Sequence, residues 1–416
     1  MSGRMQAAVA VVALLLSGAG TAVAGEANKP VLDSAERQKP GAIKLWERLV
    51  NIDSGTGDRE GVNAVGAIAS DELKQLGAAV EKVPALPAFG DNIVARLSGS
   101  GKGKVLLIAH MDTVFAKGAA AARPFRIEGN RAYGPGVSDD KAGIVVAVSV
   151  LKILDELKFK DYARLTVLLN TNEETGSRGS RVLIEQLARE HDVTLNLEGG
   201  RQDDGITIWR KGSGTITVEV KGRASHAGAA PELGRNAAME LAHQMLQLVK
   251  LASAEKGTTI NFTVVKSGDR KNIIPEHAVA DADIRAVVSE EFDRVERELP
   301  AAVKNKLIPD TEVTATLTRS FPAMSQNPQT DALAGMAQRV YGELGRTLTL
   351  GGSGGAADSS LSAGVFKPTL DGLSLIGGNA HTDREFAMVD SIVPRFYLLT
   401  RMIMELGKTP VGPKGP

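Results

Sequence analysis

The sequence predicts an α/β protein in two parts: a domain with a mostly parallel sheet, and a smaller α+β domain inserted into it. Up to about residue 211, helical patterns alternate with short apolar strands, which is typical of parallel α/β sheets. Residues 212–322 follow the order strand, helix, strand, strand, helix, strand (βαββαβ), which is the ferredoxin-like order. Residues 323–416 return to the first style, so the larger domain combines 25–211 with 323–416.

The larger domain begins with elements of regular spacing. Residues 25–40 are polar and bounded by proline, so we expect a flexible leader before a first helix at 42–50. Apolar residues from Val62 to Leu76 recur at helical spacing, and Gly77 suits the end of that helix. We then expect strands at 92–97 and 104–109, a helix at 141–157, a strand at 165–170, a helix at 180–190 and a strand at 193–198.

Helical and strand patterns also predict the elements of the inserted part and of the C-terminal part. The expected inserted elements are strand 215–221, helix 236–251, strands 258–266 and 278–287, helix 290–303 and strand 311–319. After them come a helix at 330–344, a glycine-rich stretch at 351–355, a strand at 373–376 and a last helix at 391–406. We find no internal repeat.

Composition limits the possible functions. The chain has 416 residues, of which 49 are basic and 49 acidic, so its formal net charge is zero and it offers no electrostatic reason to bind nucleic acid or anionic membranes. A small-molecule substrate is therefore favoured. The absence of cysteine excludes disulfides and thiolate chemistry, so any metal must be bound by His, Asp and Glu.

The N-terminus has the pattern of a secretory signal. Arg4 precedes the apolar run 7–16, and Ala22-Val23-Ala24 resembles a cleavage site. Its apolar core is too short to span a bilayer, although an uncleaved anchor is an alternative. We therefore expect a signal peptide at 1–24 and a secreted or periplasmic mature protein, not bound to membrane after cleavage.

Candidate functional residues follow the ends of the predicted strands. His110 ends one strand, and Asp112 lies where it could orient that imidazole as a metal ligand, although a strand-end histidine is often structural. Asp139 and Asp140 lie in a glycine-rich loop that enters a helix; one of them could be an N-cap, and the second suits a cation. All of these positions fall at one edge of the expected sheet.

Paired glutamates follow the buried strand 165–170. Glu173 and Glu174 would repel each other unless a cation or a shared proton relieves them, so one can bind metal while the other acts as a base with a raised pKa. Glu198 ends the next strand in the same way.

Three of the six histidines lie among Ser, Thr, Asp and Gly and are candidates for chemistry: His110, His226 and His381. We interpret the other three, His191, His243 and His277, as structural. Imidazoles together with carboxylates and without thiolates favour zinc or cobalt over calcium or magnesium.

Seven ordered motifs, spread over the chain from about residue 42 onward, resemble the M20 metallopeptidases, and among them the glutamate carboxypeptidases of the carboxypeptidase G type. They are His110-Met-Asp112, Gly136-Val-Ser-Asp139-Asp140-Lys141, Glu173-Glu174-Thr-Gly, Glu198, Gly222-Arg-Ala-Ser-His226-Ala-Gly, Asn272-Ile-Ile-Pro275 and His381-Thr-Asp-Arg-Glu385.

The resemblance implies two zinc ions per subunit, with cobalt as a possible substitute. Asp139 would be shared by both ions; His110 and Glu198 would complete one site, and Glu174 and His381 the other. Asp112 would orient His110. Glu173 would be the general base.

The resemblance also implies roles for the inserted domain. It would act as a lid and form a homodimer, and His226 would reach the partner's active site and stabilise the oxyanion there. Asn272 and Arg285 match residues that bind the substrate carboxylate, and we expect closure of the lid to bring both onto it. Phe321 departs from the pattern, because the related enzymes have an arginine at this position.

Taken together, these features imply a zinc-dependent carboxypeptidase or amidohydrolase that releases a C-terminal amino acid, glutamate first, from N-acyl (folate-like) or peptide substrates. An aminoacylase or a dipeptidase of the same fold would keep every metal ligand and differ in its pocket. A periplasmic binding protein without turnover is an alternative from another class, but it would need neither Glu173 beside Glu174 nor His226.

Overall fold

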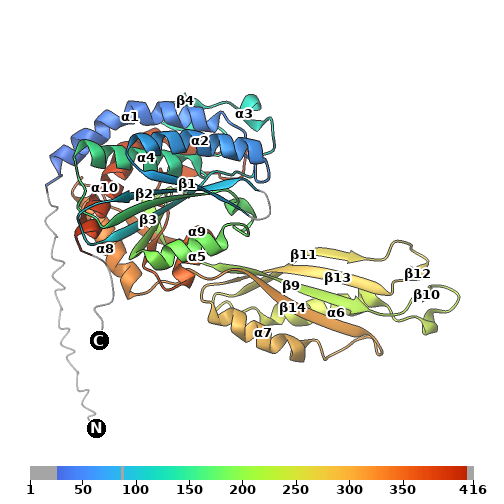
Figure 1. Ribbon diagram of the computed structural model, residues 1–416. Coiled ribbons are helices and arrows are strands. Elements are labelled where there is room, and N and C mark those ends of the chain that lie inside the picture. Colours follow the sequence, from blue (N-terminus) through green and yellow to red (C-terminus); the bar gives the residue numbers. More distant parts are fainter. Residues whose placement is uncertain (1–25, 86–88, 410–416) are drawn as a thin grey trace, which may run out of the picture.

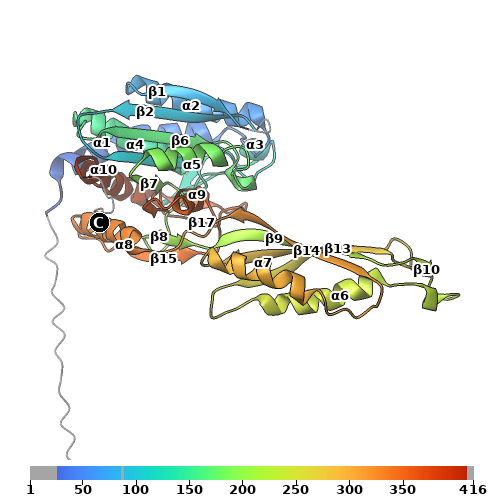
Figure 2. The same cartoon turned by 60° about the horizontal axis from the view of Figure 1, so that its bottom comes forward.

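A six-stranded sheet organises most of the chain, and a separate four-stranded sheet projects away from it (Figure 1). The computed structural model describes residues 26–85 and 89–409, so the expected signal peptide at 1–24 lies outside the described residues. A second view shows the same separation between the body and the projecting arm (Figure 2). Within the described ranges, no helix is both long and apolar enough to cross a membrane.

The six strands of the large sheet have the order β1-β2-β6-β3-β7-β16. Pairing is parallel from β6 through β3 and β7 to β16, and antiparallel between β1, β2 and β6. The predicted α/β class with a mostly parallel sheet is therefore confirmed. The strands are β1 (Ala79–Pro84), β2 (Asp91–Ser98), β3 (Lys104–His110), β6 (Arg164–Asn170), β7 (Val193–Asn196) and β16 (Thr369–Leu370).

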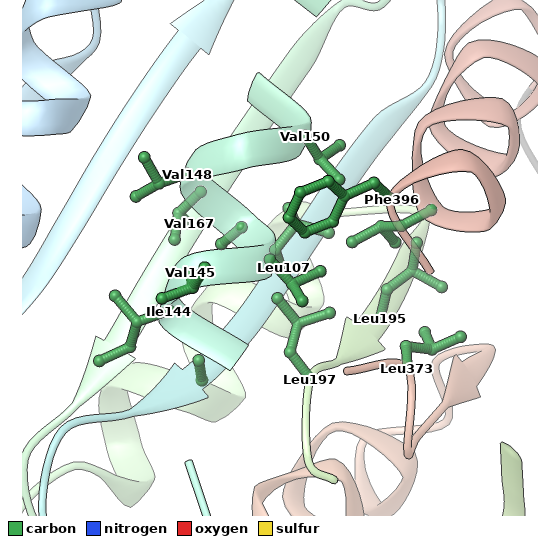
Figure 3. Close-up of a cluster of buried hydrophobic side chains, with 14 of the residues drawn as sticks. Leu107, Ile144, Val145, Val148, Val150, Val167, Leu195, Leu197, Leu373 and Phe396 are labelled. Atoms are coloured by element: carbon green, nitrogen blue, oxygen red, sulfur yellow. The ribbon is translucent and has the colours of Figure 1, made fainter. Parts of the chain in front are cut away.

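Helices cover both faces of this sheet, because its central strands are apolar on both sides. Leu107 of β3 packs into the cluster formed with α4 and α10 (Figure 3), whereas its neighbours Leu106 and Ile108 pack with α5 and α9 on the other face. The helices of this domain are α1 (Lys29–Val50), α2 (Arg59–Gln75), α3 (Ala119–Ala122), α4 (Lys141–Glu156), α5 (Arg181–Glu190), α8 (Pro328–Gly342), α9 (Asp358–Gly364) and α10 (Ile392–Lys408).

The expectation of a flexible leader at 25–40 is wrong, since α1 begins at Lys29 and continues through Pro40. Asn28 caps the helix, and Val31 and Ala35 are buried against the core. Ser34 and Arg37 also bind Glu156 of α4. These tertiary contacts outweigh the cost of an internal proline, which a reading of local sequence cannot weigh.

Short strands near the sheet edge were not predicted. β8 (Gly205–Arg210) and β15 (Thr349–Ser353) form a parallel pair, and β4 (Arg126–Glu128), β5 (Arg131–Tyr133), β17 (Gly377–Gly378) and β18 (Phe386–Met388) form a small antiparallel sheet. The prediction of a strand at 373–376 is wrong. That segment follows the end of β7 through irregular hydrogen bonds, among them Ser374 N–H to Glu198 O at 3.1 Å, and forms no regular ladder.

The inserted domain has the ferredoxin-like architecture that the sequence predicts. Its sheet has the order β11-β13-β9-β14, with every pairing antiparallel, and both helices pack on one face over their own apolar core (Figure 1). The small pair β10 (Ser225–His226) and β12 (Ile273–Ile274) lies at the end far from the body. The other elements are β9 (Gly212–Lys221), α6 (Ala237–Leu248), β11 (Thr259–Ser267), β13 (His277–Ala286), α7 (Glu290–Ala302) and β14 (Glu312–Phe321).

Candidate metal centre

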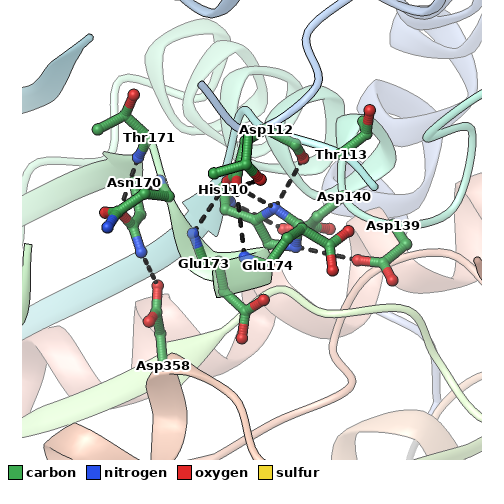
Figure 4. Close-up of polar contacts among 12 residues, drawn as sticks. His110, Asp112, Thr113, Asp139, Asp140, Asn170, Thr171, Glu173, Glu174 and Asp358 are labelled. Atoms are coloured by element: carbon green, nitrogen blue, oxygen red, sulfur yellow. Dashed lines mark hydrogen bonds and ion pairs between the residues drawn. The ribbon is translucent and has the colours of Figure 1, made fainter. Parts of the chain in front are cut away.

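Six of the predicted site residues meet at one edge of the large sheet, where β3, β6 and β7 end. The parallel alignment of these strands brings their carboxyl ends together, so short segments that are distant in sequence become neighbours (Figure 4). We name this group the strand-end cluster; it consists of His110, Asp139, Glu173, Glu174, Glu198 and His381.

Asp139 lies between the two imidazoles of the cluster. Its Oδ1 is 2.9 Å from His110 Nε2, and its Oδ2 is 3.1 Å from His381 Nε2. Each imidazole also meets a second carboxylate: Glu198 Oε1 lies 3.6 Å from His110 Nε2, and Glu174 Oε2 lies 3.0 Å from His381 Nε2. The arrangement is therefore two His–carboxylate pairs that share one aspartate.

This donor set fits a metal ion. Ligand atoms of His110, Asp139 and Glu174, and likewise of His110, Glu173 and Glu198, lie within 4.8 Å of one another. Glu174 Oε1 is buried and has no hydrogen-bond partner among the described residues, a costly state for a carboxylate oxygen that a cation would relieve. Imidazole nitrogens with carboxylate oxygens are a donor set that zinc accepts.

The pKa shifts of the cluster also indicate a bound cation. Burial, followed by the nearby charge of Glu198, raises the pKa of Glu173 well above its ordinary value. Burial and Asp139 raise the pKa of Glu198 to about 8. Hydrogen bonds to Asp139 and Glu174 raise the pKa of His381 to about 10. The cluster thus has more carboxyl groups than imidazoles, and the raised pKa values show that its carboxylates repel one another, which a bound cation would relieve.

Asp112 is fully buried and connects both sides of the cluster. His110 Nδ1 lies 3.0 Å from the Asp112 backbone oxygen and 3.4 Å from its Oδ1. The Asp112 carboxylate also accepts the backbone N–H groups of Glu173 (3.0 Å) and Glu174 (3.2 Å), and the Thr56 hydroxyl (2.6 Å). It therefore positions the glutamate loop as well as His110, which is more than the sequence predicted.

Two further carboxylates fix the Asp139 loop. Glu385, which is buried, accepts backbone N–H groups from Gly136, Ser138 and Asp139 at 2.7–3.0 Å. Asp140 accepts the His110 N–H and caps α4 through the Gly143 N–H, so it has the N-cap role that we considered. Glu385 belongs to the last motif, but its role could not be predicted from sequence, because its partners lie about 250 residues away.

The inserted domain places its candidate residues at two opposite ends. His226 and Asn272 are both exposed at the far end of this domain. Their two segments are joined there, because Ala227, the residue after His226, donates its N–H to Asn272 O (2.9 Å). Arg285 pairs with Ser213 at the opposite end of β13, next to the body. Eight residue steps separate Arg285 from His277, or about 27 Å of strand.

The sheet therefore holds Asn272 and Arg285 of one chain apart, so closure of the domain within a single chain does not bring both onto one carboxylate.

The remaining histidines have structural contacts. His191 bonds Leu187 O and Thr166 Oγ1, His243 bonds Asn305 O, and His277 bonds Glu219. Phe321 is buried, and its ring lies under the Arg181 guanidinium. The side chain at position 321, where the resemblance implies an arginine, is thus an apolar ring.

Known proteins resemble this chain over nearly its whole length. Residues 106–405 match the model of peptidase family M20/M25/M40. Carboxypeptidase G2 of Pseudomonas sp. (strain RS-16) is 39% identical over 404 residues, which cover 96% of this chain and 97% of that protein.

Solved structures share the fold. Aminopeptidase PepT from Bacillus cereus ATCC 10987 has a TM-score of 0.76 at 22% identity, covering 88% of this chain and 98% of that one. Human carnosine dipeptidase 1 has a TM-score of 0.68 at 15% identity, covering 91% and 98%. The predicted resemblance is confirmed: the chain belongs to peptidase family M20/M25/M40 and is a metallopeptidase similar to carboxypeptidase G2.

Proposed function

We propose that this protein is a zinc-dependent carboxypeptidase that releases a C-terminal amino acid, glutamate first, from N-acyl or peptide substrates. The observation that carries the proposal is the shared aspartate: Asp139 offers one oxygen to each of two His–carboxylate pairs, which suits two zinc ions, with cobalt as a substitute. Two such ions would polarise the scissile carbonyl and acidify the attacking water.

Glu173 is the general base in this proposal. In the described part of the chain no ion pair joins it to an imidazole, whereas Glu174 and Glu198 each lie within 3.6 Å of one. Burial raises its pKa, which makes it a stronger proton acceptor than an exposed glutamate. It would take the proton of the attacking water and deliver it to the leaving nitrogen. The Asp112 carboxylate holds Glu173 in place by accepting the Glu173 backbone N–H.

A homodimer through the inserted domain would complete the site. His226 and Asn272 lie at the far end of this domain, away from the strand-end cluster of their own chain (Figure 1). Val264 and Val265 on the edge strand β11, and Met239 in the first turn of α6, are exposed apolar side chains of the same domain. A twofold axis at this edge would bury them and carry His226 to the second subunit, as an oxyanion donor.

Arg285, at the body end of the same sheet, would bind the substrate carboxylate from within its own subunit. We propose boundaries for the inserted domain at 212 and 322, where β9 begins and just after β14 ends. We also propose that residues 1–24 direct secretion or periplasmic export and are removed, which N-terminal sequencing of the mature protein would test.

The test is a substrate panel assayed with metal-loaded protein, with and without a chelator. An N-acyl glutamate should be cleaved faster than its α-amide, because the amide lacks the free carboxylate, and the chelator should abolish the activity. Equal rates of cleavage for the N-acyl glutamate and its α-amide would refute the proposed carboxypeptidase activity. A large preference for N-acyl leucine would favour an aminoacylase, faster cleavage of dipeptides a dipeptidase, and binding without any turnover a binding protein.

A further inference from the structure

A cavity of about 430 Å³ opens beside the strand-end cluster, between Glu198, Glu173 and the segment that joins β15 to α9. Its size falls in the range of small-ligand sites. Two guanidinium groups line it, those of Arg201 and Arg210. Arg210 ends β8, a strand that the sequence did not predict, and neither arginine belongs to the seven motifs.

The two guanidinium groups differ in how far their nitrogens are used. Arg201 bonds through all three: Nε and Nη2 to Asp203, and Nη1 to Gly352 O. Arg210 bonds through two, with Nε at 2.6 Å from Asp371 Oδ2 and Nη1 at 3.3 Å from Gly355 O.

Arg210 Nη2 has no hydrogen-bond partner among the described residues. It is also not one of the buried unpaired polar atoms, in contrast to Nε and Nη1 of Arg395. Because Arg210 lines the cavity and this nitrogen is not sealed off, its N–H groups are available there.

The rest of the Arg210 side chain is held rigidly. It is 8% exposed, and its partner Asp371 is fully buried. Asp371 in turn accepts hydrogen bonds from the Ser359 hydroxyl and the Gly372 N–H. These bonds fix the Asp371 carboxylate, and through it the Arg210 side chain. Such a pre-organised guanidinium loses little side-chain entropy when it binds a carboxylate.

We propose that Arg210 is a specificity-determining residue that binds a second carboxylate of the substrate, in addition to the free α-carboxylate. This rests on the proposed function and extends it. Phe321 itself supplies no cation, and the Arg181 guanidinium on its ring does not line this cavity. Arg210 does, beside Glu173 and Glu198. The second carboxylate belongs either to the side chain of the released residue or to the acyl group.

The competing explanation is that Arg210 only balances the charges of Asp371 and Glu198. The two explanations differ in their dependence on the substrate. A purely structural arginine would affect all substrates alike, whereas a binding arginine affects those that carry the second carboxylate. A charged hydrogen bond is worth about 1.5–3 kcal/mol, which corresponds to roughly ten- to a hundredfold in kcat/KM.

The experiment compares two matched pairs of substrates: N-acyl glutamate with N-acyl glutamine, and N-succinyl leucine with N-butyryl leucine. Each pair differs in one carboxylate. In Arg210→Met, the ratio of kcat/KM for acid over neutral partner should fall ten- to a hundredfold in one pair, and that pair identifies which end of the substrate carries the carboxylate. Arg210→Lys should restore part of the ratio.

Binding gives a second measurement that does not depend on turnover. Calorimetric titration of metal-loaded protein with glutarate and with its monoamide should show a preference for the dicarboxylate that Arg210→Met loses; melting temperature and metal content confirm that the variant is folded and loaded. Unchanged ratios in both pairs together with unchanged binding of the dicarboxylate, or an equal loss of kcat/KM for all four substrates, would overturn the proposal. Turnover of no substrate would reject the proposed function, and the titration would still decide the role of Arg210.

Discussion

Asp112→Asn should separate positioning from metal ligation, because the amide keeps the size of the side chain but cannot keep its hydrogen bonds. Oδ1 accepts the Glu173 N–H and Oδ2 accepts the Glu174 N–H. An asparagine turns its NH₂ group toward one of these two donors in either orientation. One largely buried N–H therefore loses its acceptor, at a cost of about 1–3 kcal/mol.

That cost is small enough for the protein to fold, so the change should appear at the cluster. Loss of a residue that orients a ligand typically weakens metal binding about 10–100-fold. We expect Asp112→Asn to show this loss in a competition titration with a zinc chelator, and kcat to fall at saturating zinc because the Glu173 loop is no longer fixed.

Asp192→Asn is a matched control at the other end of β3. Among the described residues, the Asp192 side chain accepts only the Lys104 N–H, at 2.7 Å, and an asparagine can keep that bond by presenting its oxygen. The control should therefore retain both zinc affinity and kcat. If Asp112→Asn behaved like this control, Asp112 would not position the cluster.

Three further predictions concern the base, the dimer and the inserted domain. Glu173→Ala should abolish turnover and retain two zinc ions by elemental analysis, whereas Asp139→Ala and His381→Ala should lose metal; loss of both ions from Glu173→Ala would refute its role as base. Mixing His226→Ala with Glu173→Ala subunits should restore part of the activity once subunits exchange, since one composite site is then intact, and no recovery would place His226 outside the partner's site. Hydrogen bonds from Arg294 lower the pKa of Glu291 from 4.5 to about 2. The Glu291 carboxylate therefore stabilises the folded state at every pH above its ordinary pKa. This contribution, about 3 kcal/mol, is lost as the pH falls from about 4.5 to 2. Glu291→Gln should therefore flatten the acid unfolding curve over that interval, as followed by circular dichroism, and an unchanged curve would contradict this account.

The cluster could be predicted from sequence because each of its residues directly follows an apolar strand or lies in a short loop with glycine. His110 and Glu174 are close to β3 and β6, whose apolar runs are strong signals. Parallel pairing of these strands then brings the two residues together without further information. The fold class followed from the same alternation, and the inserted domain from its βαββαβ order.

What could not be predicted depends on contacts between distant segments. α1 is stabilised around Pro40 by Glu156, more than 100 residues away. β8 gains its partner β15 from a segment about 140 residues further along the chain. Arg210 was missed for that reason: its position beside the cluster follows from β8, and its orientation from Asp371, neither of which leaves a pattern near residue 210.

The geometry of the inserted domain limits how a substrate carboxylate can be held. Asn272 and Arg285 are at opposite ends of one rigid antiparallel sheet, and closure of the domain moves both together without shortening the distance between them. A single chain can therefore offer Arg285 near its own cluster, or Asn272 to another site, but not both to one substrate. If both residues bind the same carboxylate, they must come from different subunits. The dimer that His226 requires is then also the condition for carboxylate recognition, and a monomeric variant should lose both together.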